Sequence, residues 1–91
     1  MPAPNTPAPR VGNAQWLGHR GVLRRSGHYS DGVQSYVLDD PITLRPLIEV
    51  VPCRGMNLDA HLTRTVQLYG WTWYRGDLRR NFMQASQLRV E

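Results

Sequence analysis

The stretch GMNLDAHLTRTVQLYG (residues 55–70) places two different patterns in succession. At its start, Asn57 is a good helix cap, and two leucines stand four residues apart on one helical face. At its end, valine and leucine alternate with polar residues, which is typical of a strand with one buried face. We therefore expect one or two helical turns over about residues 57–63, followed by a strand over residues 65–71.

Strand patterns separated by turn-forming residues continue on both sides of this stretch. With the strand just described, the expected strands cover residues 16–25, 33–40, 47–53, 65–71 and 83–90. Three strands, a short helix and two further strands are the order of an OB-fold, a five-stranded, partly open barrel. We predict an all-β fold with one short helix, a small five-stranded OB-like barrel. An SH3-like barrel is the alternative, because both architectures bend short strands into the same closed shape.

The apolar positions of these elements predict a single modest core, as expected for a chain of 91 residues. The residues expected to be buried are Leu23, Val37, Ile48, Val50, Leu58, Leu62, Val66, Leu68 and Leu88.

Residues 1–13 form a proline-rich tail that precedes the barrel domain of residues 14–91. The tail contains Pro2, Pro4, Pro7 and Pro9, which favour an extended polyproline-II conformation. Its composition is that of a disordered segment, and it is too polar to enter the core. If the tail is ordered, we expect it to lie in a groove, for example on a neighbouring subunit.

The composition excludes several classes of protein. The single cysteine, Cys53, excludes an internal disulfide and cysteine-based zinc motifs. No apolar run approaches the ~18 residues of a membrane span, and the N-terminus has no signal-peptide pattern. We expect a soluble protein, cytoplasmic or, if the chain is a mature fragment, exported. The net charge is +4 and all eleven basic residues are arginine, a bias that GC-rich codon use explains, so the charge is weak evidence for nucleic-acid binding.

Four short sequence motifs of the chain are similar to motifs in other proteins. They are YVLDD (36–40), IEVVP (48–52), GMNLDAHLTRTVQLYG (55–70) and RGDLRRNFMQASQLRV (75–90). In these motifs the chain resembles a family of small, uncharacterised bacterial β-barrel domains of the planctomycete type. The resemblance implies an OB-like or SH3-like barrel, often exported, and it supplies no catalytic residues.

One loop contains the residue types of a hydrolytic triad. The segment SGHYSDG places Ser26, His28, Ser30 and Asp31 close together. A triad requires fixed positions on a scaffold rather than adjacency in a loop, and these residue types also favour turns. We therefore expect a turn here, not a catalytic site.

Other candidates for chemistry are equally weak. Asp39 and Asp40 could form a carboxylate pair, but they precede a proline and adjacent strand residues point to opposite faces. No pair among His19, His28 and His61 has the spacing of metal ligands. We expect no enzyme, no bound metal and no cofactor.

Two segments combine arginines with aromatic residues, RRSGHYSDG (24–32) and YGWTWYRGDLRR (69–80). In an OB-fold they would flank the surface that commonly binds oligonucleotides and oligosaccharides. We expect one of the two tryptophans in the second segment to be structural and the other exposed. The expected binding surface comprises Arg24, Arg25, Tyr29, Trp71, Trp73, Tyr74, Arg75, Arg79 and Arg80.

Two functions fit this surface. The first is a protein-interaction or self-assembly module, in which the prolines of the tail dock on another copy near Trp71 or Trp73 and create a ring or a filament. The alternative is a module that binds single-stranded nucleic acid. Asp31 and Asp77 lie inside the two segments and would repel phosphate, so the sequence favours the first function.

Overall fold

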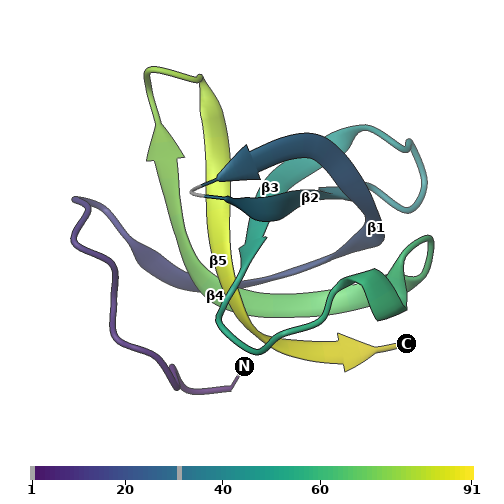
Figure 1. Cartoon of the computed structure of the whole chain (residues 1–91), viewed down its shortest axis with the longest axis horizontal. Helices are drawn as coiled ribbons and strands as arrows, with labels where there is room; N and C mark the ends of the chain where they lie inside the picture. Colours follow the sequence, from purple (N-terminus) through teal and green to yellow (C-terminus); the bar gives the residue numbers. More distant parts are fainter. Residues whose placement is uncertain (1, 31) are drawn as a thin grey trace.

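The computed structural model describes residues 2–30 and 32–91. Its strands close into one barrel, which confirms the predicted all-β fold with five strands (Figure 1). The strands are β1 (Gln15–Ser30), β2 (Val33–Asp39), β3 (Pro46–Pro52), β4 (Thr65–Arg75) and β5 (Arg80–Val90). Within the described ranges, no helix has the length and apolar character that crossing a membrane would require.

The strands follow each other around the barrel in the order β1-β2-β3-β5-β4, and β4 returns to β1. Neighbouring strands are antiparallel except β3 and β5, which run parallel. This order, with the helical segment between β3 and β4, is that of the OB-like barrel expected from the sequence.

β1 is long because it belongs to two sides of the barrel. Its first half, Gln15–Val22, pairs with β4, and its second half, from Val22 onward, pairs with β2. The strand turns from one partner to the other beside Gly21, where an added Cβ would lie 2.7 Å from the backbone oxygen of Asp39. Only glycine allows the two backbones to approach this closely.

The core lies inside the barrel and matches the predicted pattern closely. All of the expected residues are buried except Leu62 and Leu88, which are partly buried and pack against the core. Val37 is buried on the outer surface, whereas its neighbours Tyr36 and Leu38 point inward. The core also contains Tyr36, Leu38, Met83 and Ala85, which were not predicted to be buried.

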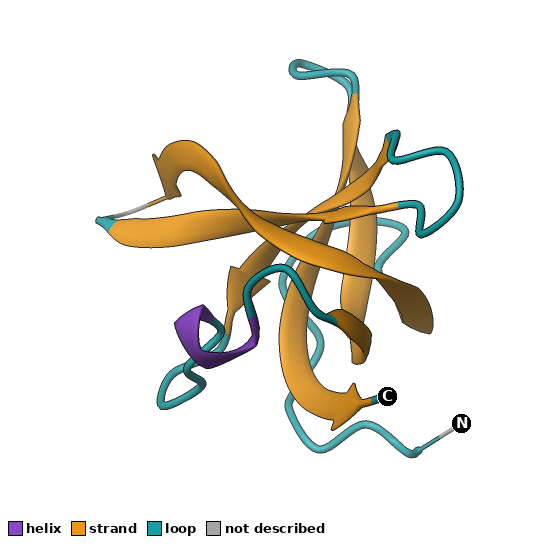
Figure 2. Ribbon diagram, turned by 90° about the vertical axis from the view of Figure 1, so that its right-hand side faces the viewer, coloured by secondary structure: helices purple, strands orange, loops and turns teal. Residues whose placement is uncertain are grey.

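The predicted helix is shorter than expected. It is a single 3-10 turn, η1 (Asp59–His61), and it begins after Leu58 without a side-chain cap from Asn57 (Figure 2). Leu58 is buried in the core, and the Thr63 amide donates a hydrogen bond to the Leu23 carbonyl at 2.8 Å. Because the connection is fixed to the barrel on both sides of η1, a longer helix has no room.

The predicted turn over residues 26–32 is also wrong in part, because β1 continues to Ser30. The pairing of β1 with β2 shifts register between Arg25 and Tyr29, and Gly27 has a φ of 83°. This stretch is therefore a bulge within a strand, and the bulge provides the local bend that the sequence pattern suggested.

Asp40 behaves as the turn-forming residue that the sequence predicted. Its side chain accepts hydrogen bonds from the amides of Ile42 (2.8 Å) and Thr43 (2.9 Å). These two bonds stabilise the charged carboxylate and lower the pKa of Asp40 below its ordinary value.

We expect Leu68→Ala to lower the free energy of unfolding by about 2–5 kcal/mol, because the Leu68 side chain is 0% exposed in the core. The matched control is Ile42→Ala, whose side chain is 90% exposed and which should change stability by less than about 0.5 kcal/mol. Urea denaturation followed by tryptophan fluorescence measures both. Equal effects of the two variants would show that the register of β4 is wrong.

Candidate ligand-binding groove

A groove of about 420 Å³ crosses the outer surface of β2 and β3. The end of β1 and the beginning of β5 form its two walls. In a five-stranded OB-like barrel this is the face on which ligands commonly bind. The lining residues include the apolar Val37, Leu47 and Ile48, the polar Ser26, His28, Glu49 and Asn81, and the arginines Arg24, Arg79 and Arg80.

Strand alternation brings these side chains to one face. Arg24 pairs with Val37 across β1 and β2, and Val37 pairs with Glu49 across β2 and β3. The same row continues on β5 with Phe82 and on β4 with Trp73. Residues that are directly opposite each other point to the same side of a sheet, so these five form one row across the outer surface.

The row ends in an aromatic cluster beside the groove. Trp73 stacks on Phe82 with ring centroids 6.4 Å apart and an angle of 21° between the planes. The Arg75 guanidinium lies over the Phe82 ring at 5.5 Å, and it also forms an ion pair with Asp77 at 2.9 Å. Phe82 is buried by these neighbours, whereas Trp73 remains half-exposed.

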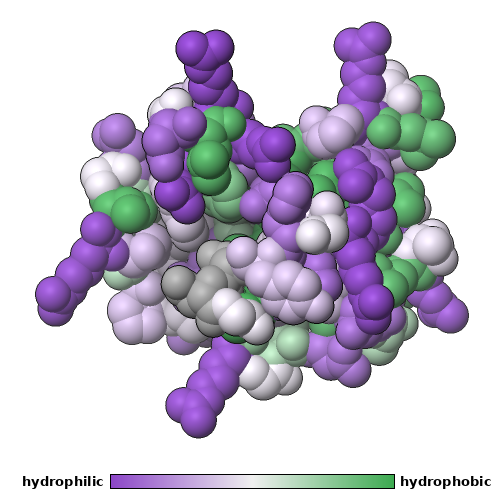
Figure 3. Space-filling model, turned by 45° about the horizontal axis from the view of Figure 1, so that its top comes forward, coloured by the Kyte–Doolittle hydropathy of each residue, from purple (hydrophilic) through white to green (hydrophobic). Residues whose placement is uncertain are grey.

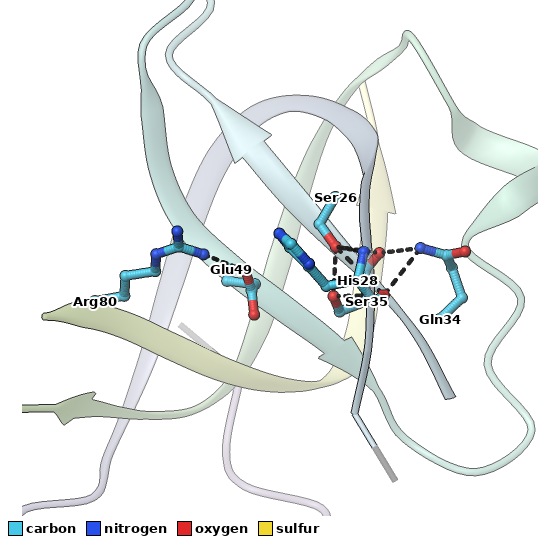
Figure 4. Close-up of polar contacts among 6 residues, drawn as sticks. All are labelled: Ser26, His28, Gln34, Ser35, Glu49 and Arg80. Carbon is cyan, nitrogen blue, oxygen red and sulfur yellow. Dashed lines mark hydrogen bonds and ion pairs between the residues drawn. The ribbon is translucent and has the colours of Figure 1, made fainter. Parts of the chain in front are cut away.

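Two of the three arginines in the groove are paired with carboxylates. Arg24 Nε lies 2.6 Å from Asp39 Oδ2, and Arg80 Nη1 lies 3.2 Å from Glu49 Oε1 (Figure 4). Arg79 forms no ion pair with any described residue. The face drawn in Figure 3 carries long hydrophilic side chains that project from the surface, with apolar side chains in small separate groups.

A network of hydrogen bonds fixes the bulge of β1 that forms one wall of the groove (Figure 4). The His28 carbonyl accepts from the Ser35 hydroxyl (3.0 Å) and from the Gln34 amide (3.2 Å), and the His28 amide donates to Ser26 Oγ (3.0 Å). The Ser26 hydroxyl also bonds to Ser35. Ser26 thus contacts the backbone of His28 and not its imidazole, and Asp31 lies outside the described residues.

Only some of the residues predicted to form the binding surface line the groove. Of the arginines, it includes the three at 24, 79 and 80. Arg25 is not part of it, because its Nε bonds to Asp59 Oδ1 at 3.0 Å beside η1. Glu49 and Asn81, which line the groove, were not predicted because their positions depend on the pairing of β3 with β5.

The expectation of one structural and one exposed tryptophan is wrong, because both are half-buried. Trp71 packs edge-to-face against Trp16, with centroids 5.7 Å apart, and Trp73 stacks on Phe82. The strongly exposed aromatic side chains are instead Tyr29 (70%) and Tyr74 (59%).

The proline-rich tail lies against the barrel of its own chain, so the contacts that the structure describes are within one molecule (Figure 1). The indole of Trp16 donates to the Pro2 carbonyl (2.7 Å), and the indole of Trp71 donates to the Thr6 carbonyl (2.9 Å). The Gln87 amide donates to the Ala3 carbonyl (3.2 Å).

These contacts use backbone carbonyls, whereas we expected the prolines themselves to dock near Trp71 or Trp73. Pro4 and Pro7 are exposed, and Pro2 and Pro9 are half-buried. Trp71 was predicted to lie near the docked tail, but Trp16 and Gln87 were not. The one signal in the sequence was that Trp16 lies in an expected strand. Docking of the tail on a neighbouring copy stays a prediction.

The three histidines lie in different environments. His19 is on the inner face of β1, where burial lowers its pKa, His28 is in the groove, and His61 is in η1. In the part of the chain that the structure covers, no three residues among histidine, cysteine, aspartate and glutamate come together as a metal site would require.

A comparison with protein-family models, with curated proteins and with solved structures found no match to this chain. The resemblance to small bacterial barrel domains therefore stays a prediction.

We expect Tyr36 to ionise late, because burial and then its hydrogen bond to Asp59 Oδ1 (2.7 Å) raise its pKa to about 12. The neutral phenol stabilises the fold fully below pH 10.0, the ordinary pKa, and this contribution is lost as the pH rises toward 12. Absorbance titration of the phenolate should show a step near pH 12 that disappears in Tyr36→Phe. In the control Tyr29→Phe the late step should remain; its loss there would contradict the assignment.

Proposed function

We propose that this protein is a non-enzymatic binding module whose groove binds single-stranded nucleic acid. The observation that carries the proposal is the convergence of Arg24, Arg79 and Arg80 on a groove across β2 and β3. OB-like barrels commonly bind extended polymers on this face, and phosphate is the ligand that clustered arginines suit best.

The arginines keep donors for phosphate although two of them are paired. A guanidinium has five N–H donors, and the ion pair of Arg24 with Asp39 uses Nε while that of Arg80 with Glu49 uses Nη1. The remaining donors can contact phosphate oxygens without breaking either pair. Arg79 forms no ion pair with a described residue, so it is the arginine on which we expect phosphate binding to depend most.

Aromatic side chains beside the groove can stack on bases. Trp73 continues the row of residues that forms the groove, and its half-exposed ring is held in place by Phe82. Tyr29 is exposed on β1, which forms one wall of the groove, and Tyr74 is exposed on β4, the neighbour of the other wall, β5. Base stacking on aromatic rings contributes about 1–3 kcal/mol per base and tolerates any sequence.

Asp39 and Glu49 limit the affinity of the groove for phosphate. Their carboxylates lie next to the arginines and repel phosphate, so the affinity should be moderate. Because the attraction comes from contacts between arginines and phosphates, the affinity should still fall as salt rises. Self-assembly, which the sequence favours with docking near Trp71 or Trp73, is the second candidate function. Trp16, Trp71 and Gln87, which bond to the tail, do not line the groove, whereas docking at Trp73 would compete with base stacking.

We expect the chain to bind a fluorescent oligothymidylate at low salt, measured by anisotropy over a salt series. Arg79→Ala should weaken binding and reduce the slope of log K against log salt by about 0.7, the value for one lost phosphate contact on a single strand. The matched control is Arg64→Ala, which removes the same charge from an exposed position outside the groove.

Two outcomes would contradict this function. The first is an absence of binding at low salt. The second is an equal loss of affinity in Arg79→Ala and Arg64→Ala, which would mean that only the net charge matters and that the groove has no role.

A further inference from the structure

We propose that the proline-rich tail exchanges between two copies of this chain, so that each tail binds the barrel of the other. The acceptor is the tail-binding surface, which we define as Trp16 on β1, Trp71 on β4 and Gln87 on β5. This proposal is independent of nucleic-acid binding, because the tail-binding surface and the groove share no residue.

The tail-binding surface has the chemistry of a polyproline-II acceptor. A polyproline-II segment makes no internal hydrogen bonds, so its carbonyls are free to accept bonds from a partner. Here two indole N–H groups and one amide donate to three carbonyls of residues 2–6. Aromatic grooves recognise proline-rich segments in this way. Each of these bonds can form equally well with the tail of another molecule.

The hinge between the tail and β1 favours exchange. To reach the surface of its own barrel, the chain folds back over residues 9–13, where the Val11 amide bonds to the Pro9 carbonyl at 2.8 Å. Asn13 adopts a φ of 67°, a left-handed conformation that asparagine adopts more readily than most other residues but that still costs it more free energy than it costs glycine. Pro9 and the residue before it prefer extended backbone. An open, extended hinge removes this strain and keeps every tail contact.

Reciprocal exchange closes the assembly. When each of two chains gives its tail to the other, the contacts are related by a two-fold axis and both tail-binding surfaces are occupied. The ring or filament expected from the sequence would instead require every tail to dock in one direction. An extended hinge spans about 3.5 Å per residue, so the eight residues 7–14 give ample reach between two barrels.

The intramolecular contact competes with exchange. A short tether holds the tail near its own barrel at an effective concentration of roughly millimolar. The parent chain should therefore be mainly monomeric when dilute, and a change that blocks the fold-back should shift the equilibrium toward the dimer.

Asn13 offers a matched pair of variants in the full chain. Asn13→Pro cannot adopt the left-handed φ, because the proline ring holds φ near −65°, whereas Asn13→Gly adopts it without strain. We expect Asn13→Pro to dimerise at least about tenfold more tightly than Asn13→Gly, as measured by sedimentation equilibrium. Asn13 precedes β1, so far-UV spectra of both variants should match that of the parent chain.

A second substitution shows where the dimer contact lies. In the Asn13→Pro chain, Trp71→Phe keeps an aromatic ring but removes the donor to the tail, and it should weaken the dimer. Trp73→Phe is the control, because the hydrogen bonds to the tail come from Trp16, Trp71 and Gln87 among the described residues.

Two results would overturn the proposal. One is a folded Asn13→Pro chain that remains monomeric at every concentration. If that monomer also binds a free peptide of residues 1–10, the surface accepts proline-rich peptides but not the tail of a second copy. The other is a dimer that Trp71→Phe and Trp73→Phe affect equally.

Discussion

The close approach of β1 to β2 at Gly21 is the constraint on which the rest of the structure depends. It allows one strand to pair with β4 before the bend and with β2 after it, which closes the barrel. The two halves of β1 also carry the two surfaces of interest. Trp16 beneath the tail lies before the bend, and Arg24 and His28 in the groove lie after it. A single backbone contact thus separates the candidate groove from the surface beneath the tail, on opposite halves of one strand.

The elements that depend on local patterns were predictable, and those that depend on distant contacts were not. The alternation of apolar and polar residues predicted the number of strands, their order along the chain and most of the core, including Leu23 and Leu68. The extension of β1 to Ser30 depends on hydrogen bonds between Ser26 and Ser35 on the neighbouring strand. The residues around Ser26 do not predict these bonds. η1 is short for a similar reason, since Leu58 is buried and Thr63 is bonded to β1.

The arginines of the candidate groove were predictable from the sequence, but the carboxylates beside them were not. The arginines at 24, 79 and 80 follow from the expected positions of two segments in an OB-like barrel. The sequence does not reveal that Glu49 lies opposite Phe82, because the parallel pairing of β3 and β5 joins strands that are distant in the chain. Glu49 and Asp39 orient the guanidinium groups of Arg80 and Arg24, so the carboxylates that weaken attraction for phosphate also fix where the donors point.

The parallel pairing of β3 with β5 has a consequence for the order of folding. β5 follows the other four barrel strands in the sequence, and it lies between β3 and β4 in the barrel. β1 through β4 can form an open sheet during synthesis, but the ring has no closing strand until β5 emerges from the ribosome. Until then the nascent chain exposes two unpaired strand edges and an apolar inner face, the features that make folding intermediates aggregate. The dependence on distant pairings also places this barrel among the slower-folding small domains.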